Sequence, residues 1–190
     1  MSISSMIVLG ALAALVVYAI VVYNGLVGLK HSVSKSLANI DVLLKQRHDE
    51  LPKLVETCKQ YMQYEQQTLE RVINARSRVA QAQQAHDIAA LGSAEGDLRA
   101  GLGQLFALAE NYPELKTNDT FRQLQDRISG LENAIADRRE IYNESVNNNN
   151  VRIEQFPDAI LARFFNFKAF QLLQFSAEEK SDVNVAALFK

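Results

Sequence analysis

The chain has 190 residues, of which 48% are hydrophobic, 22% charged and 8% aromatic, a composition typical of one folded domain with a short appendage. Eight glycines and three prolines are too few for the many tight turns of a β-sandwich or barrel, so long helices are favoured. The formal net charge of −2 gives no electrostatic case for a nucleic-acid partner, and the single cysteine, Cys58, can form neither an internal disulfide nor a multi-thiolate metal site.

The first 29 residues contain no charged side chain. Within them, Met6 to Tyr23 form an apolar stretch of 18 residues, which as a helix measures roughly 27 Å, close to the hydrocarbon thickness of a bilayer. A cleaved signal peptide would have a positive charge before its apolar core, and residues 2 to 5 carry none. We therefore favour a retained transmembrane anchor over residues 1–29.

The charges next to the span predict its orientation. Lys30, His31 and Lys35 follow it, whereas only the terminal amine precedes it. Positive residues favour the cytoplasmic side. We expect a single-pass protein of the inner (plasma) membrane with its N-terminus outside and its C-terminal domain in the cytoplasm.

Residues 26–82 are predicted to form one long amphipathic helix, kinked rather than interrupted at Pro52. Its apolar positions recur at alternating steps of three and four, and Arg47, Glu65 and Thr68 are the polar members of the series. The membrane-proximal part of this stripe consists of Val33, Leu37, Ile40, Leu44 and Leu51.

Three further helices are expected. The second follows an N-cap at Asp87 and ends near Asn111, with Glu95 in phase with its leucines. The third opens with a capping-box pattern at Thr120 and runs to about Phe156, loosening at residues 147–150, where four asparagines have poor helix propensity. The fourth spans 158–170, and the tail from residue 176 shows no clear period, with a possible short strand at 182–185.

The helix lengths suggest an uncovered surface. Counted from Lys30, the first helix is roughly 80 Å long, the second about 37 Å and the third about 54 Å. The membrane-proximal stripe would then have little to cover it, and an exposed apolar stripe of that length favours association. We expect it to pair with other copies of the protein.

Catalytic motifs are absent: no HExxH, CxxC, GxSxG or Walker pattern occurs. Charged residues on the apolar stripes are better explained as a buried network that fixes which helix faces which, because an unpaired interior charge is costly. The residues we assign to this structural polar network are Arg47, Glu65, Arg76, Glu132 and Arg139. A carboxylate-rich bundle that binds metals or acts as an enzyme is the alternative, although no histidine completes a Glu-x-x-His motif.

A series of motifs resembles one known family. They are Tyr23-Asn24-Gly25-Leu26-Val27, Ile40-Asp41-Val42, Arg47 to Val55, Tyr64-Glu65, Ala75-Arg76, Glu110 to Leu115, Phe121 to Gln125, Arg139 to Asn143 and Phe156-Pro157. In this order, from Tyr23 to about Phe167, they are similar to the LemA family of bacterial membrane proteins. The resemblance implies an all-α fold: one N-terminal transmembrane helix continuous with an elongated antiparallel four-helix up-and-down bundle. It implies no established activity.

Two positions depart from the family pattern. Asn149-Asn150 stand where Tyr-Asn is usual, and Asn166 replaces a usual glycine. Both departures concern the local geometry of the fourth helix.

The expected organisation is an anchor (1–29), a LemA-like bundle (30–170) and a C-terminal tail (171–190). The expected function is that of a non-enzymatic scaffold or interaction protein without cofactors. Its expected partners are the lipid bilayer and other copies of itself, with another membrane protein as a further candidate, but not nucleic acid. The aromatic segment around Phe164 could lie on a bilayer, but we favour a helix face that covers the chain's own core.

Overall fold

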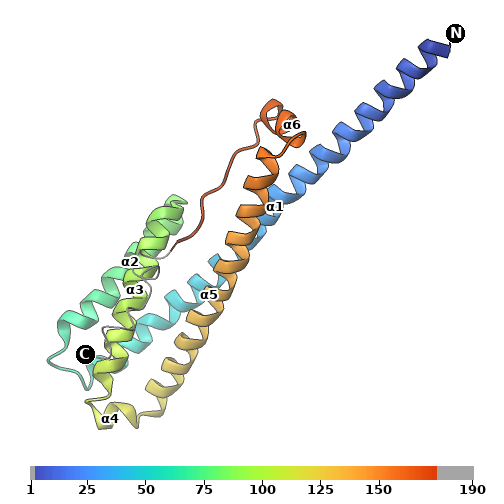
Figure 1. Ribbon diagram of the computed structural model, residues 1–190. Coiled ribbons are helices and arrows are strands. Elements are labelled where there is room, and N and C mark those ends of the chain that lie inside the picture. Colours follow the sequence, from blue (N-terminus) through green and yellow to red (C-terminus); the bar gives the residue numbers. More distant parts are fainter. Residues whose placement is uncertain (1–2, 175–190) are drawn as a thin grey trace, which may run out of the picture. The chain divides into compact units, whose positions relative to one another are not determined.

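The fold is all-α, as the sequence predicts. The computed structural model describes residues 3–174, and within them it contains helices and no strand. The helices, shown in Figure 1, are α1 (Ile3–Lys59), α2 (Gln66–Ala85), α3 (Ile88–Ala109), α4 (Pro113–Lys116), α5 (Asp119–Glu154) and α6 (Asp158–Phe164). Most of the predicted tail, including the possible strand at 182–185, lies outside the described residues.

The chain divides into two compact units. Within the described residues, we call 3–38 with 140–172 the anchor unit, and 39–139 with 173–174 the bundle unit. Both α1 and α5 contribute to each unit, so the units share two helices. Each unit is described by itself below.

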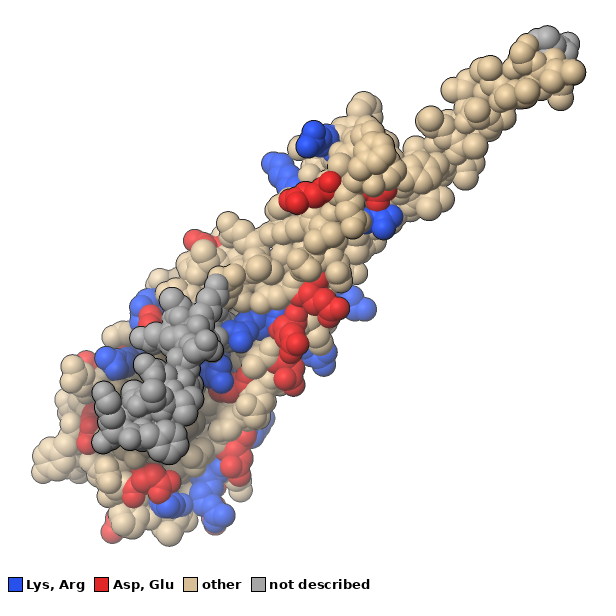
Figure 2. Space-filling model, in the orientation of Figure 1, with Lys and Arg blue, Asp and Glu red and all other residues tan. Residues whose placement is uncertain are grey.

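Helix α1 begins in the charge-free segment and ends earlier than predicted. Its N-terminal part is long and apolar enough to cross a membrane, and Figure 2 shows no charged side chain on that part. Pro52 lies inside the helix without ending it. The helix instead ends at Lys59, and the predicted single helix over 26–82 is wrong, because a turn at residues 60–65 separates α1 from α2. The backbone N–H groups of Tyr61 and Met62 both bond the carbonyl of Cys58 there.

The bundle unit is built from four helical segments: the end of α1, α2, α3 and the first part of α5. Its core contains the apolar stripe predicted for each helix. The buried members include Leu51, Leu54, Val72, Val79, Leu91, Leu98, Leu102, Leu105, Phe121, Ile128 and Ile135. A four-helix bundle is thus present, as the fold class predicts, but its helices differ from the predicted set: the predicted first helix supplies both α1 and α2, and the predicted fourth helix, 158–170, is not part of this unit.

Local sequence explains where these helices begin and end. The carboxylate of Asp87 accepts a hydrogen bond from the N–H of Ala90, the expected N-cap of α3. At the start of α5 the cap is Asn118, whose side-chain oxygen accepts from the N–H of Phe121. The N-cap is therefore Asn118 and not Thr120, two residues earlier than predicted. Asparagine is at least as good an N-cap residue as threonine.

The expectation of an uncovered stripe on α1 is contradicted. Val33, Ile40, Leu44 and Leu51 are buried, and Leu37 is half-buried. The expectation assumed a first helix of roughly 80 Å, whereas from Lys30 to Lys59 the helix measures about 45 Å.

Contacts with α5 are found in each unit separately. In the anchor unit, Ser36 Oγ lies 3.1 Å from Ser145 Oγ. In the bundle unit, Arg47 bonds Glu132.

In the anchor unit α5 continues unbroken through the four asparagines, so the predicted loosening at 147–150 is wrong. Asn150 makes a pair of hydrogen bonds with the backbone of Phe170, accepting from its N–H and donating to its carbonyl, both at 2.9 Å. Asn149 donates to the carbonyl of Lys168 at 3.3 Å. Asn149, which departs from the usual Tyr, and Asn150, which matches the family pattern, therefore hold residues 168–170 against α5.

The fourth predicted helix is shorter than expected. Helix α6 ends at Phe164 because Asn166 adopts a left-handed conformation with φ 57°. The N–H of Asn166 bonds the carbonyl of Arg163, and the N–H of Phe167 bonds that of Ala162, which is the Schellman pattern of a helix end. Asparagine tolerates this conformation better than most residues, which accounts for its place where the family usually has glycine.

Gly92 gives a direct test of packing in the bundle unit. A Cβ at this position would lie 2.1 Å from the carbonyl oxygen of Gln174, too close for the backbone to stay in place. We predict that Gly92→Ala lowers the thermal unfolding temperature and increases amide exchange at Gln174.

Gly103→Ala is the matched control, because Gly103 lies in the same helix with nothing within 4 Å of a Cβ. Its higher helix propensity should stabilise α3 by up to about 1 kcal/mol. Equal effects of the two substitutions would contradict the close approach at Gly92.

Candidate functional site

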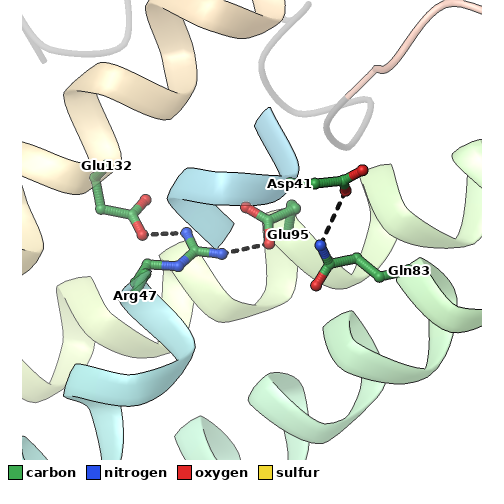
Figure 3. Close-up of polar contacts among 5 residues, drawn as sticks. All are labelled: Asp41, Arg47, Gln83, Glu95 and Glu132. Carbon is green, nitrogen blue, oxygen red and sulfur yellow. Dashed lines mark hydrogen bonds and ion pairs between the residues drawn. The ribbon is translucent and has the colours of Figure 1, made fainter. Parts of the chain in front are cut away.

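The most buried polar feature of the bundle unit is a charge cluster of one arginine and two glutamates from three helices (Figure 3). Arg47 on α1 donates from Nη2 to Glu95 on α3 and from Nη1 to Glu132 on α5. Arg47 is 1% exposed, Glu95 2% and Glu132 17%. A fully buried guanidinium thus joins α1 to two other helices.

The cluster has one positive and two negative groups, and their interactions shift the pKa values of Arg47 and Glu95. Burial alone would lower the pKa of Arg47, but the charges and hydrogen bonds of both glutamates outweigh it and raise that pKa. Burial raises the pKa of Glu95, and attraction to Arg47 offsets only part of this effect. The guanidinium stays charged and engages an oxygen of each carboxylate, so the arrangement is suited to structure rather than proton transfer. Its Nε is buried without a hydrogen-bond partner among residues 3–174.

Polar contacts also join α2 to α1. Gln83 donates to Asp41 at 3.0 Å (Figure 3). Arg76 donates from Nε to the backbone carbonyl of His48 at 3.0 Å, and its Nη2 lies 2.7 Å from His48 Nε2. Since a guanidinium can only donate, His48 Nε2 must accept, which requires the neutral imidazole. Burial, and then the charge of Arg76, lower the pKa of His48.

The residues assigned to the polar network from sequence do not all meet. Arg47 and Glu132 are in direct contact, whereas Arg76 bonds His48 instead of a carboxylate. Glu65 is the N-cap residue of α2 and is half-buried, and Arg139 is half-buried on α5. Sequence reasoning placed Glu95 in phase with the stripe of α3 but left it out of the assigned set.

Glu50 is a buried charge that the sequence did not single out. Its carboxylate pairs with Arg127 of α5 at 3.1 Å and with Lys53 at 3.2 Å. It lies directly before Leu51, off the stripe, so periodicity gave no signal for it.

The anchor unit contains a second polar cluster, close to the apolar part of α1. Asp158, 5% exposed, accepts a hydrogen bond from the hydroxyl of Tyr18 at 3.4 Å and pairs with Arg152. Nearby, Val22 and Leu26 pack with Ala162 of α6. Helix α6 is therefore held against the end of the charge-free segment.

An open pocket of about 510 Å³ lies in the same unit. Its lining combines aromatic and basic side chains from α1 and from the segment after α6. The lining residues are Tyr23, Val27, Lys30, His31, Phe165, Asn166, Phe167, Lys168 and Phe170. The rings of Tyr23 and Phe165 are 4.7 Å apart.

Catalytic and metal-binding arrangements have little support in the described part of the chain. No group of three or more histidine, cysteine, aspartate or glutamate residues suited to a metal is found there. Cys58 is buried, and burial raises its pKa to about 12, so its thiol is a poor nucleophile at neutral pH.

The charge cluster should dominate the stability of the bundle unit. We predict that Arg47→Ala lowers the free energy of unfolding by about 3 to 5 kcal/mol, because two carboxylates lose their buried partner. Arg78→Ala removes an exposed ion pair with Asp97 and should cost at most about 1 kcal/mol. Denaturant unfolding measures both, and equal losses would contradict the importance of the cluster.

The contact between Arg76 and His48 predicts a pH dependence. Because the pKa of His48 is lowered in the folded state, the unfolded chain binds more protons, and stability falls as the pH drops below about 6.5. In His48→Gln the unfolding temperature should decrease less between about pH 7.5 and 5.5. His31→Gln is the control and should keep the wild-type dependence. Identical slopes in all three proteins would show that His48 is not the group responsible.

Comparison with known proteins identifies one matching family and several similar proteins. The family model described as the LemA family matches residues 36–186. Magnetosome protein MamQ 2 and MamQ 1 of Paramagnetospirillum magneticum are each 34% identical over 85 residues, which is 45% of this chain and 31% of theirs. Magnetosome protein MamQ of Magnetospirillum gryphiswaldense is 35% identical over 79 residues, which is 42% of this chain and 29% of its own.

The matches span about a third of the length of these relatives, so only that part of each relative is shown to be similar to this chain. The family model, by contrast, covers most of the chain. The chain belongs to the LemA family.

Proposed function

We propose that this protein is a membrane-anchored, non-enzymatic helical scaffold. In this proposal α1 crosses the inner membrane of a bacterium once, with its N-terminus outside, and the bundle unit holds other proteins at the cytoplasmic face. The single observation that carries the proposal is the continuity of α1, which is one helix from a charge-free apolar segment into a core of buried charges.

The apolar segment has the properties of a lipid-facing helix. Its large side chains, such as Leu9, Leu15 and Val21, are exposed rather than packed against the rest of the chain. A soluble protein would bury such a surface. Lys30 and Lys35 follow the segment directly, which supports the cytoplasmic placement of what comes after it.

A non-catalytic role is supported by the way the buried charges are used. Glu95 and Glu132 hold Arg47, and Glu50 holds Arg127, so these carboxylates already have partners within the fold. The relatives are named as magnetosome proteins, and their names describe no reaction. The alternative, a carboxylate-rich metal-binding bundle, predicts stoichiometric metal in the purified protein, which elemental analysis measures.

Self-association remains a part of this proposal, but on a different surface. The membrane-proximal stripe is buried within the monomer, so copies can meet only through side chains that remain exposed. Most of the exposed apolar residues of α1 lie in the candidate span, which includes the small pair Gly10 and Ala14. The size of the protein solubilised from membranes, compared with that of one chain, tests this part.

Anchoring is tested by placing charges in the candidate span. Leu12→Arg with Val16→Arg should move most of the protein from the membrane pellet to the supernatant on alkaline carbonate extraction. Each arginine at the centre of a span costs roughly 2.5 to 3.5 kcal/mol.

Val42→Arg is the control, since Val42 is an exposed residue of α1 beyond the span. It should leave the protein in the pellet. Retention of the doubly charged variant in the pellet, or loss of the wild type from it, would contradict the anchor.

A further inference from the structure

Helix α6 presents an apolar surface that the fold does not cover. Ile160 and Phe164, four residues apart on α6, are exposed by 61% and 79%, and Phe156, which precedes the helix, is exposed by 83%. The opposite side of α6 packs through Ala162 onto Val22 and Leu26 of α1. The helix is therefore apolar on two sides. Of the aromatic segment expected to cover the chain's own core, Phe167 packs against Val22, Leu26 and Ala162, whereas Phe164 is exposed.

The position of α6 along α1 indicates what meets this surface. Tyr18, which bonds Asp158, and Tyr23, which contacts Phe165, both belong to the predicted span of residues 6–23. Five residues of helix rise only about 7.5 Å, so α6 is attached at one end of the hydrocarbon layer. Helix α6 is thus attached beside the end of the apolar segment, where Val17 and Val21 of α1 are exposed.

The polar groups of α6 are compatible with this position. Asp158 is neutralised by Arg152 and bonded by Tyr18, which lowers the cost of a carboxylate near lipid. Asn166, Lys168 and Lys30 line the pocket described above together with the aromatic rings.

Charge in the pocket favours a phosphate. Its lining contains Lys30, His31 and Lys168 and no acidic residue. Among residues 3–174, neither lysine has an ion-pair partner. Lys30 follows Tyr23 by about 10 Å along α1, comparable with the 5 to 8 Å of headgroup layer on each side of a bilayer.

We propose that α6 is inserted into the bilayer interface beside the span, and that the pocket holds the headgroup phosphate of an anionic phospholipid of that bilayer. Phe156, Ile160 and Phe164 contact acyl chains, and Lys30 and Lys168 bind the phosphate. This inference rests on the proposed anchoring by α1. It assigns to the protein a lipid-binding site in addition to its span.

The absence of tryptophan from the chain makes a direct test possible. Phe164→Trp places one fluorophore on α6 in the full chain, reconstituted in vesicles whose acyl chains are brominated and quench nearby tryptophan. Leu12→Trp is the control inside the span. Ser34→Trp is the control on an exposed turn of α1 about 16 Å beyond Tyr23.

We expect strong quenching for Phe164→Trp and Leu12→Trp and little for Ser34→Trp. If Leu12→Trp is quenched and Phe164→Trp is not, the insertion of α6 is wrong while the anchor stands. If Leu12→Trp is not quenched either, the anchor fails and this inference fails with it.

Lipid selectivity tests the headgroup site in the same vesicles. At equal mole fraction, brominated phosphatidylglycerol should quench Phe164→Trp more than brominated phosphatidylcholine does. Adding Lys30→Gln or Lys168→Gln should lower the relative affinity for phosphatidylglycerol by about fivefold for each lysine removed. Lys35→Gln should leave the selectivity unchanged, since Lys35 is an exposed lysine of the same unit that does not line the pocket. Equal quenching by both lipids, or selectivity that survives loss of both lysines, would overturn the phosphate site.

Discussion

The bundle unit depends on one buried guanidinium. Arg47 cannot lose its charge and cannot reach water, so the fold must supply carboxylates at its position. Glu95 and Glu132 do so from α3 and α5, which restricts how those two helices can rotate or slide against α1. Apolar stripes alone would tolerate several registers. The charge cluster makes one of them much more favourable than the others.

The anchor unit uses neutral groups for a similar purpose. Asn149 and Asn150 bond the backbone of the segment after α6, and the hydroxyl of Tyr142 donates to the carbonyl of Gln171 at 2.9 Å. These contacts hold the non-helical segment after α6 against α5. The result is that α6 stays beside the apolar part of α1, where the proposed lipid contacts arise.

Much of the fold follows from the sequence, and the errors have physical causes. Periodicity identified the buried faces of α3 and α5, but it cannot detect a turn that keeps the same phase, as at residues 60–65. There the polar members Glu65 and Thr68 were the only sign, since the turn contains no glycine or proline. The wrong expectation that the α1 stripe is uncovered followed from this error in helix length. In the charge cluster, Arg47 and Glu95 lie in phase with the apolar stripes, but phase does not show which charged residues face one another. Glu95 could therefore be joined to Arg47 and Glu132 only once the facing helices were known.

The central claim is that the Arg47 cluster selects the arrangement of the helices, beyond stabilising it. A triple substitution, Arg47→Met with Glu95→Leu and Glu132→Leu, removes every charge of the cluster and leaves an apolar core. The distance distribution between spin labels at Val42→Cys and Gly103→Cys, both exposed and in the bundle unit, reports on α1 and α3. We predict one narrow distance with the cluster present, and a broad or multiple distribution in a triple variant that is still helical. One narrow, unchanged distance in the triple variant would contradict the account.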